Sequence, residues 1–390
     1  MLNVNPTLPR YGTDPHPTVT FMDFGLDGGP LSQSLTGVGH YTLELAQALA
    51  RIAPEDRFEL VSPLPSLHRS ELPSNLRVTQ AETSAHLWWQ VGLPRYIRRA
   101  RLRVFHGTNY SVPLWKMCPT VVTIHDLSLL LWPQTHAQHL ARRARWRLPL
   151  MARRADAIIV PSQSIKREVC EHLRIDESKI TAIPEAPRAS FSPVAETTAI
   201  RRRMNIGDDF ILFVGTIEPR KNLLTLVRAF EEIIRNSACY TQLILAGDEG
   251  WLTGELHGFL KNAEFNERVR LVGYLADDDL RALYSSCRVF VYPSLYEGFG
   301  LPLLEAMACG APVVTSNIPS IRETVGDAAL LVSPTDVSEL VRSLVRLLEN
   351  PGEREQRSAA GKQHASKFSW DKAAAGTLDI YRRLSMNQSV

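Results

Sequence analysis

The sequence predicts an α/β protein of two domains, each built on a parallel sheet that is covered by helices on both faces. The first observation is length, because 390 residues exceed what a single hydrophobic core usually organises. The second is that short apolar runs alternate with helical patterns, which is typical of parallel sheets. The third is the proline-rich stretch at residues 184–193, after which the same alternation begins again. We therefore expect two domains that face a central cleft.

The predicted strands fall into two series, one on each side of the proline-rich stretch. In the first series they cover residues 19–24, 58–61, 104–106, 120–124, 157–160 and 180–183. In the second series they cover residues 210–214, 242–246, 269–273, 289–292, 312–315 and 328–332. Most are separated by helical patterns, so each series predicts one parallel sheet with crossover helices. We place a flexible arm at residues 1–17, the first domain at residues 18–190 and the second at residues 191–369.

Composition argues against several classes of protein. A hydrophobic content of 44% and a charged content of 22% are ordinary for a globular chain, and a net charge of +3 argues against a dedicated nucleic-acid binder. The five cysteines are scattered and form no CxxC pair, which argues against a zinc or disulfide framework and favours a reducing cytoplasm. No apolar run approaches the length of a membrane span, and the first residues lack the apolar core of a signal peptide.

The most informative stretch covers residues 289–316. An apolar strand is followed by a loop with Gly298 and Gly300, and then by a helix with a proline in its first turn. Such a unit offers free backbone amides and the positive end of a helix dipole, both of which favour phosphate. Glu297 in the loop and Glu305 on the helix add carboxylates that can accept hydrogen bonds from hydroxyls. The stretch fits a nucleotide sugar, and two solvated acids on a connector are the alternative.

Three further sets of residues follow predicted strands, where ligands bind in open α/β sheets. Gly37 and Gly39 lie in the loop after the first strand, which is either a ligand loop or a tight connector. His125 ends another strand, although a lone histidine is more often structural. Arg220 and Lys221 lie between a strand and a helix, where cations clamp a diphosphate or form a surface basic pair.

The central stretch resembles the signature of the retaining GT-B glycosyltransferases of family GT4. The resemblance is carried by Glu297-Gly298-Phe299-Gly300-Leu301-Pro302 and by Glu305-Ala306-Met307-Ala308-Cys309-Gly310. It implies that Glu297 contacts the hydroxyls of the donor sugar and that Glu305 binds the ribose. It also implies that the amides of Phe299, Gly300 and Leu301 hold the sugar and phosphate.

The resemblance extends to the other loops. It implies that the loop with Gly37 and Gly39 approaches the donor, and that His125, in a His-Asp pair, lies near the donor sugar and the acceptor. A second candidate for lining the cleft is His106, at the end of an earlier strand.

In the second half, the resemblance implies that Arg220 and Lys221 neutralise the diphosphate leaving group, and that the segment containing Tyr274 meets the nucleotide base through its backbone. Some family members carry an arginine at the position of Thr216, so the division of labour between Arg220 and Lys221 stays open.

Fold and mechanism follow from the same resemblance. It implies the GT-B fold, with a C-terminal helix at residues 370–386 that packs back on the first domain. It also implies a front-face reaction in which the leaving phosphate helps to deprotonate the acceptor. No Asp-x-Asp motif follows a strand, and we interpret Asp277 to Asp279 as the N-cap of a helix. We therefore expect no cofactor and no obligatory metal, with the diphosphate charge met by Arg220, Lys221 and helix dipoles.

The donor and the acceptor are less constrained. The segment from Gly215 to Asn222 is similar to that of family members that use GDP-mannose to build bacterial surface polysaccharide, while UDP-sugars stay open as donors. The acceptor class is a glycan or a lipid-linked glycan. The alternatives are a nucleotide-sugar 2-epimerase of the same fold, a GT-B phosphorylase, for which no cofactor lysine can be placed, and a non-catalytic subunit that binds sugar nucleotides.

Two arginine-rich segments are relevant to where in the cell the protein acts. Residues 95–103 and 142–154 interleave arginines with apolar side chains, including Trp146. Solvated helix faces would produce this pattern, and so would docking on an anionic membrane surface, which a lipid-linked acceptor requires. We expect a cytoplasmic protein, with peripheral binding to the inner face of the plasma membrane as a hypothesis.

Overall fold

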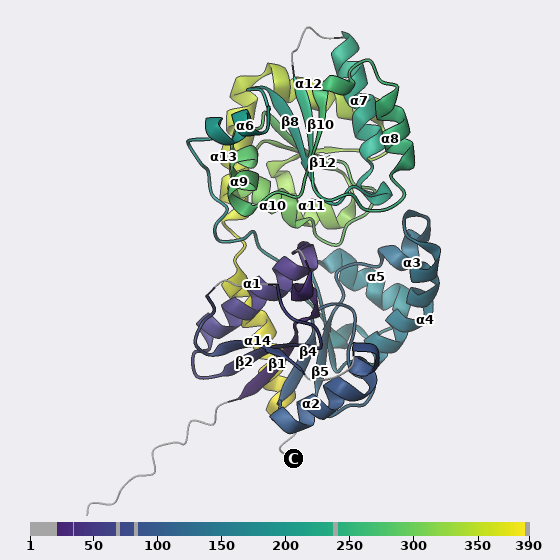
Figure 1. Ribbon diagram of the computed structural model, residues 1–390, viewed down its shortest axis with the longest axis vertical. Helices are drawn as coiled ribbons and strands as arrows, with labels where there is room; N and C mark the ends of the chain where they lie inside the picture. Colours follow the sequence, from purple (N-terminus) through teal and green to yellow (C-terminus); the bar gives the residue numbers. More distant parts are fainter. Residues whose placement is uncertain (1–21, 34, 68–70, 82–84, 237–240, 387–390) are drawn as a thin grey trace, which may run out of the picture.

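The computed structural model describes residues 22–386 apart from 34, 68–70, 82–84 and 237–240. The predicted N-terminal arm, the start of the first predicted strand and Cys239 therefore lie outside the described residues. The chain forms two α/β domains that are stacked along the long axis of the molecule (Figure 1). The predicted fold class is confirmed.

The described strands form two parallel sheets, one in each domain. Seven strands make the first, in the order β3-β2-β1-β4-β5-β6-β7, and six make the second, in the order β10-β9-β8-β11-β12-β13. The first sheet consists of β1 (Asp23–Asp27), β2 (Arg57–Ser62), β3 (Leu76–Gln80), β4 (Val104–Gly107), β5 (Thr120–Thr123), β6 (Ala157–Val160) and β7 (Ile180–Ala182). The second consists of β8 (Phe210–Val214), β9 (Gln242–Ala246), β10 (Val269–Gly273), β11 (Val289–Tyr292), β12 (Val313–Ser316) and β13 (Leu330–Val332).

Helices cover both sheets. The first domain contains α1 (Gly37–Ile52), α2 (Leu93–Ala100), α3 (Ser128–Leu131), α4 (Gln138–Arg154) and α5 (Gln163–Leu173). The helices that follow are α6 (Thr198–Arg203), α7 (Leu223–Asn236), α8 (Gly254–Lys261), α9 (Asp277–Ser286), α10 (Leu301–Ala308), α11 (Pro319–Val325), α12 (Val337–Glu349), α13 (Pro351–Ala365) and α14 (Trp370–Met386).

The last helix, α14, returns to the first domain and lies along α1 (Figure 1). Its Trp370 and Tyr381 are buried in the core that surrounds β1, where the ring of Tyr381 lies 5.1 Å from that of Phe24. The fully buried ring of His106 donates to or accepts from Tyr381 at 2.6 Å and Thr123 at 2.7 Å. His106 is therefore part of this core, and the expectation that it lines the cleft is wrong.

The structure differs from the sequence expectations in two elements. Strand β3 was not predicted, because its sequence LRVTQ is largely polar and only its first residue is buried. The aspartates Asp277 to Asp279 do not cap α9, as interpreted above, but form its first turn, after an N-cap at Ala276. Carboxylates in a first turn stabilise a helix through its dipole, which explains the acidic run without a ligand.

Both sheets reverse their strand order at a point that faces the other domain. The reversal lies between β1 and β4 in the first sheet and between β8 and β11 in the second. Ligands of open α/β sheets bind at the carboxyl ends of the strands beside such a point. In Figure 1, α1 of the lower domain and α10 and α11 of the upper domain lie at the boundary between the two domains. The fold thus directs two ligand-binding edges toward one cleft.

Candidate active site

A cavity of about 140 Å³ lies between the two domains, at the carboxyl ends of the strands. The first domain contributes Leu35, Thr36, Gly37 and His40, and the linker contributes Arg188. The second domain contributes Val214, Gly215, Thr216, Ala246, Gly247, Asp248, Tyr274, Leu275, Leu280, Leu301, Pro302 and Glu305. The cavity is thus lined by the loops that follow β8, β9 and β10 and by the first turns of α1 and α10.

Glu297 stands beside this cavity in a cluster of buried charges. Its Oε1 accepts from the Lys221 ammonium at 2.5 Å, and its Oε2 lies 3.0 Å from an Arg220 guanidinium nitrogen. Arg220 also pairs with Glu218 at 2.6 Å and donates to the carbonyl of Tyr296 at 2.9 Å. Two consecutive cations of one loop therefore hold the carboxylate of another loop.

The charges of this cluster are fixed by burial and by one another. Burial would raise the pKa of Glu297, but the attraction of Arg220 and Lys221 and the hydrogen bond from Lys221 lower it to about 2. The pKa of Lys221 is lowered overall. Burial is the main cause and Arg220 adds to it, while Glu297 opposes the shift without reversing it. Glu297 is therefore a carboxylate at neutral pH, shared by two cations.

The cluster adjoins the cavity through Gly215, the residue after β8. The Lys221 Cε lies 3.7 Å from the position that a Cβ on Gly215 would take, and Gly215 itself lines the cavity. The φ angle of Gly215 is 152°. The Nε of Arg220 is buried without a hydrogen-bond partner among the described residues. This part of the site therefore combines cations with an unused donor.

The loop from Pro293 to Gly300 brings the two domains into contact. A Cβ on Gly298 would lie 1.8 Å from the His125 carbonyl oxygen, so only glycine fits at this approach. The carbonyl of Gly298 accepts from the Ser162 hydroxyl at 3.0 Å, and the Tyr296 hydroxyl accepts from the Leu127 amide at 2.9 Å. The domains are thus held together at the loop that carries Glu297.

His125 follows the carboxyl end of β5 but is not among the residues that line the cavity, and both of its ring nitrogens are engaged. Its Nε2 lies 2.9 Å from the Thr108 carbonyl oxygen, which can only accept, and its Nδ1 lies 3.2 Å from Glu185 Oε1. Burial lowers the pKa of His125, but the hydrogen bond and charge of Glu185 outweigh this effect and raise it. Both ring nitrogens thus face acceptor oxygens, so neither is free to take a proton from a substrate while these contacts persist.

Glu305 lies on α10 in the cavity wall and is paired with a residue of the linker. The Nε of Arg188 donates to Glu305 Oε1 at 2.7 Å. Burial raises the pKa of Glu305, and the neighbouring Arg188 partly opposes that shift. Neither Arg188 nor Glu185 was predicted as a site residue, because the proline-rich linker shows no periodicity that points to buried side chains.

The other predicted donor-binding residues divide into two groups. Gly37, Tyr274 and Leu301 line the cavity, as Glu305 does. Gly39, Phe299 and Gly300 have packing roles, shown by their neighbours. A Cβ on Gly39 would lie 2.9 Å from Leu35, the Phe299 ring packs against that of Phe368 at 6.1 Å, and Gly300 adopts a φ of 93° before α10.

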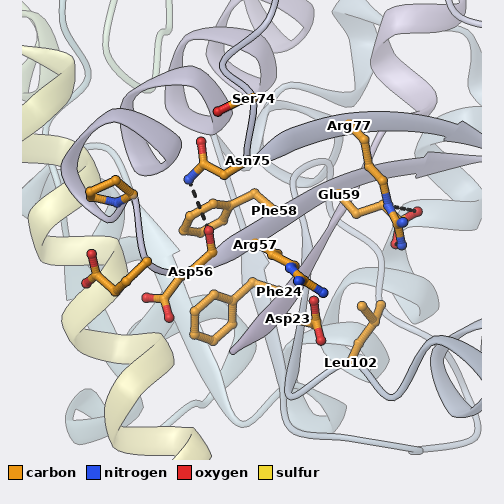
Figure 2. Close-up of a pocket in the computed structure, with 12 residues that line it drawn as sticks. Asp23, Phe24, Asp56, Arg57, Phe58, Glu59, Ser74, Asn75, Arg77 and Leu102 are labelled. Atoms are coloured by element: carbon orange, nitrogen blue, oxygen red, sulfur yellow. Dashed lines mark hydrogen bonds and ion pairs between the residues drawn. The ribbon is translucent and has the colours of Figure 1, made fainter. Parts of the chain in front are cut away.

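A larger cavity, of about 330 Å³, lies at the opposite edge of the first sheet. Figure 2 shows that it is bordered by Asp23, Arg57 and Asn75, at the amino ends of β1, β2 and β3. Asn75 there donates to the backbone oxygen of Asp56 at 3.0 Å (Figure 2). Because ligands of such sheets bind at the carboxyl ends, we assign the active site to the smaller cavity between the domains.

Two features are absent from the described residues. In the part of the chain that the structure describes, no helix combines the length and apolar character that crossing a membrane requires. Within the same residues, no three histidine, cysteine, aspartate or glutamate side chains are grouped as metal ligands.

Known proteins resemble this chain along most of its length. Residues 196–364 match the family described as Glycosyl transferases group 1, and residues 35–186 match Glycosyltransferase Family 4. The O-antigen chain mannosyltransferase B of Escherichia coli is 30% identical over 376 residues, which are 91% of this chain and 98% of that protein.

Solved structures agree with the fold. Sucrose-phosphate synthase from Thermosynechococcus elongatus superposes with a TM-score of 0.76 at 22% identity, over 93% of this chain and 99% of that one. HepE from Anabaena, solved with UDP and glucose, gives a TM-score of 0.72 at 18% identity, over 93% and 99%. At these identities the likeness concerns the arrangement of two facing α/β domains.

Proposed function

The chain belongs to the GT-B glycosyltransferases of family 4, and we propose that it is a retaining mannosyltransferase that takes mannose from GDP-mannose. The proposed acceptor is a glycan or a lipid-linked glycan of bacterial surface polysaccharide. One observation carries this proposal: the cavity between the domains has Glu305 in its wall and adjoins the cluster of Arg220, Lys221 and Glu297. Carboxylates for hydroxyls and cations for a diphosphate are thus placed together.

The proposed binding mode follows the positions of these groups. Tyr274, which lines the cavity in the loop after β10, is proposed to meet the base, while Glu305 in the same wall is proposed to accept hydrogen bonds from the ribose. In this mode the diphosphate is bound by Arg220, whose Nε has no partner among the described residues, and by the ammonium of Lys221, since cations bind phosphate oxygens strongly. Glu297 holds both cations and accepts from the hydroxyls of the sugar.

The proposed reaction is a front-face displacement with retention of the anomer. The acceptor hydroxyl forms its bond to the anomeric carbon on the face from which the diphosphate leaves, and an oxygen of the leaving phosphate takes the hydroxyl proton. The state of His125 supports this route, because its two ring nitrogens are both engaged and it is not free to act as the base. Closure at Gly298 keeps water from the reacting carbon.

We also propose that the enzyme needs no metal ion. Arg220, Lys221 and the N-terminus of α10 supply positive charge that can offset the charge developing on the leaving group. The test is transfer after dialysis against EDTA, with and without added Mg²⁺ or Mn²⁺. Loss of transfer on chelation and its recovery with metal would contradict the proposal.

The donor is proposed from the relatives, and it can be tested without an acceptor. One relative is named a mannosyltransferase, whereas a structural neighbour was solved with UDP and glucose. We would measure binding and slow hydrolysis of GDP-mannose, UDP-glucose and UDP-N-acetylglucosamine, and record the anomer of the released sugar by NMR. We expect GDP-mannose to bind at least about tenfold more tightly than the others, a difference of about 1.4 kcal/mol. Tighter binding of a UDP-sugar, or an inverted anomer, would contradict the donor or the mechanism.

We propose a cytoplasmic protein that binds peripherally to the inner face of the membrane through α4. Helix α4 exposes Arg142, Arg143 and Arg145, with Trp146 61% exposed among them. Trp115 is 66% exposed in the loop after β4, which Arg154 contacts by donating to the Leu114 carbonyl at 3.2 Å. Basic residues and an interfacial tryptophan together favour an anionic bilayer surface.

Liposome sedimentation tests this surface. Replacing Arg142, Arg143 and Arg145 by glutamine should abolish sedimentation with vesicles that contain phosphatidylglycerol. Replacing Arg202, Arg203 and Arg235, exposed on the second domain, removes the same charge and should leave sedimentation unchanged. Equal loss in both variants, or no dependence on anionic lipid, would remove α4 from the membrane contact.

A further inference from the structure

Arg188 is the residue at which three parts of the molecule meet. It lies in the linker between the sheets, yet it is only 6% exposed. Its Nε donates to Glu305 on α10 at 2.7 Å, and one terminal nitrogen donates to Asp277 on α9 at 2.5 Å. The same nitrogen lies 3.3 Å from His40 Nε2 on α1 of the first domain. A buried guanidinium in the linker thus contacts both domains.

The surroundings of Arg188 fix its charge and its orientation. The guanidinium carbon lies 4.0 Å above the ring of Phe191, which holds the plane of the group. Burial opposes the charge, but Glu305 and Asp277 raise the pKa of Arg188. Burial and the charge of Arg188 lower the pKa of His40 to about 3, so His40 is a neutral acceptor for the linker residue.

Arg188 also separates two cavities. It lines the cavity between the domains, in which Glu305 is found. It lines a second cavity of about 350 Å³ as well, bordered by linker residues 187–189 and by residues 365–371, where the chain crosses back to the first domain. The linker and the crossover that leads to α14 therefore both border this second cavity. We expect the position of the Arg188 side chain to depend on the paths of these two segments.

We propose that Arg188 is a positioning residue for Glu305, through which the linker sets the ability of the site to recognise the ribose of a nucleotide. The guanidinium occupies Oε1 of Glu305, and in this proposal the carboxylate held in that way accepts from the ribose hydroxyls. A planar fork can hold Glu305 and Asp277 at once, which a single ammonium group does less well. This inference rests on the proposed role of Glu305 as the ribose ligand.

The experiment compares nucleotides that differ only in the ribose. GDP and 2′,3′-dideoxy-GDP are titrated calorimetrically into the full chain, with UDP and its dideoxy form as a second pair. The wild-type protein should prefer the ribonucleotide by about 10- to 100-fold, because hydrogen bonds to a charged group are lost in the dideoxy form. Glu305→Gln and Arg188→Gln should each reduce this preference to about threefold or less, while Arg188→Lys should retain an intermediate preference.

A matched control variant, together with the ratio of the affinities for the ribonucleotide and the dideoxynucleotide, distinguishes a loss of positioning from a loss of folding. Arg203→Gln removes another arginine–aspartate pair, exposed between α6 and α9, and should retain the wild-type preference. Because the preference is a ratio measured on folded protein, general destabilisation does not change it. A wild-type protein without ribose preference would overturn the role of Glu305 and this inference with it. A preference lost in Glu305→Gln but retained in Arg188→Gln would overturn the inference alone.

If Arg188→Gln does not fold, Arg188→Lys tests the positioning role. It keeps the buried positive charge that balances Glu305 and Asp277, so it is expected to fold. A ribose preference equal to that of the wild type would show that the fork is not needed, and the positioning role would be wrong. An intermediate preference with the expected fold would support it.

Discussion

The two faces of the cleft are assembled in different ways. On the second domain, Glu297, Arg220 and Lys221 come from loops of one sheet and pair with one another. On the first domain, His125 is held by Glu185, which belongs to the linker. The cluster of Glu297, Arg220 and Lys221 is therefore complete within its domain, whereas His125 depends on the chain that joins the domains. Changes in the charge cluster of the second domain should affect binding and chemistry directly. Changes at the contacts of His125 on the first domain should affect closure.

The largest effect on transfer is expected when the charge cluster of the second domain loses Glu297. Glu297→Gln removes the charge shared by Arg220 and Lys221, and transfer should fall by at least about 100-fold. Leaving two buried cations short of a partner should also lower the free energy of unfolding by about 3–5 kcal/mol. Transfer is measured with saturating donor, and stability by urea denaturation. Glu231→Gln, which removes an exposed pair with Arg235, serves as the control. Near-normal turnover would remove Glu297 from the site.

Gly298→Ala tests the contact between the faces. The added Cβ would lie 1.8 Å from the His125 carbonyl oxygen, so the domains cannot close as they do here. We expect transfer to fall by about 100-fold, because small displacements of reacting groups cost that much, while nucleotide affinity stays within about threefold. Gly254→Ala is the matched control, since a Cβ there meets nothing within 4 Å. Equal transfer rates in the two variants would show that closure at Gly298 is not required.

Lys221→Ala separates phosphate binding from base and ribose binding. Loss of a buried cation should weaken GDP by about tenfold or more, and should leave the affinity for guanosine, which lacks phosphate, unchanged. Competition with a fluorescent nucleotide measures both. An unchanged affinity for GDP would refute the role of Lys221 at the diphosphate, and equal losses for both ligands would indicate a general disturbance of the site.

Glu185→Gln tests the face that depends on the linker. Glu185 raises the pKa of His125, so the ion pair stabilises the folded state below the ordinary histidine pKa of 6.5, and this stability is lost as pH rises through the folded pKa. In the variant, the charge of Glu185 no longer raises that pKa, while burial still lowers it and the contact with Thr108 and the charge of Asp126 still raise it. The loss of unfolding free energy should thus be greater at pH 6 than at pH 9, and we expect about 1–2 kcal/mol at pH 6. A loss that is the same at both values would mean that His125 is neutral in the wild-type protein.

The same difference between the faces explains what the sequence could predict. The cluster on the second domain comes from contiguous motifs at strand ends, so both Glu297 and the pair Arg220 and Lys221 could be found from pattern. Glu185 and Arg188 could not, because their burial arises only when the two domains close on the linker. Gly37 and Gly39 were expected near the donor from the resemblance of their loop, but the pattern does not distinguish Gly37, in the cavity wall, from Gly39, which lies close to Leu35.

The smallest effect on turnover is expected at Asp27, a buried carboxyl at the end of β1 in the first domain. Its burial raises the pKa from 3.8 to about 6, against one hydrogen bond from the Gly29 amide. The folded state therefore holds this proton more tightly than the unfolded chain, and stability falls as pH rises from about 4 to 6 and is constant above.

Asp27→Asn keeps the oxygen that accepts from Gly29 and cannot ionise. It should thus raise the free energy of unfolding by up to about 3 kcal/mol at pH 7.5, by little at pH 4, and change transfer by less than about threefold. Thermal denaturation at the two pH values measures this, and a variant less stable than the wild type at pH 7.5 would show that the carboxylate has a partner that the asparagine cannot replace.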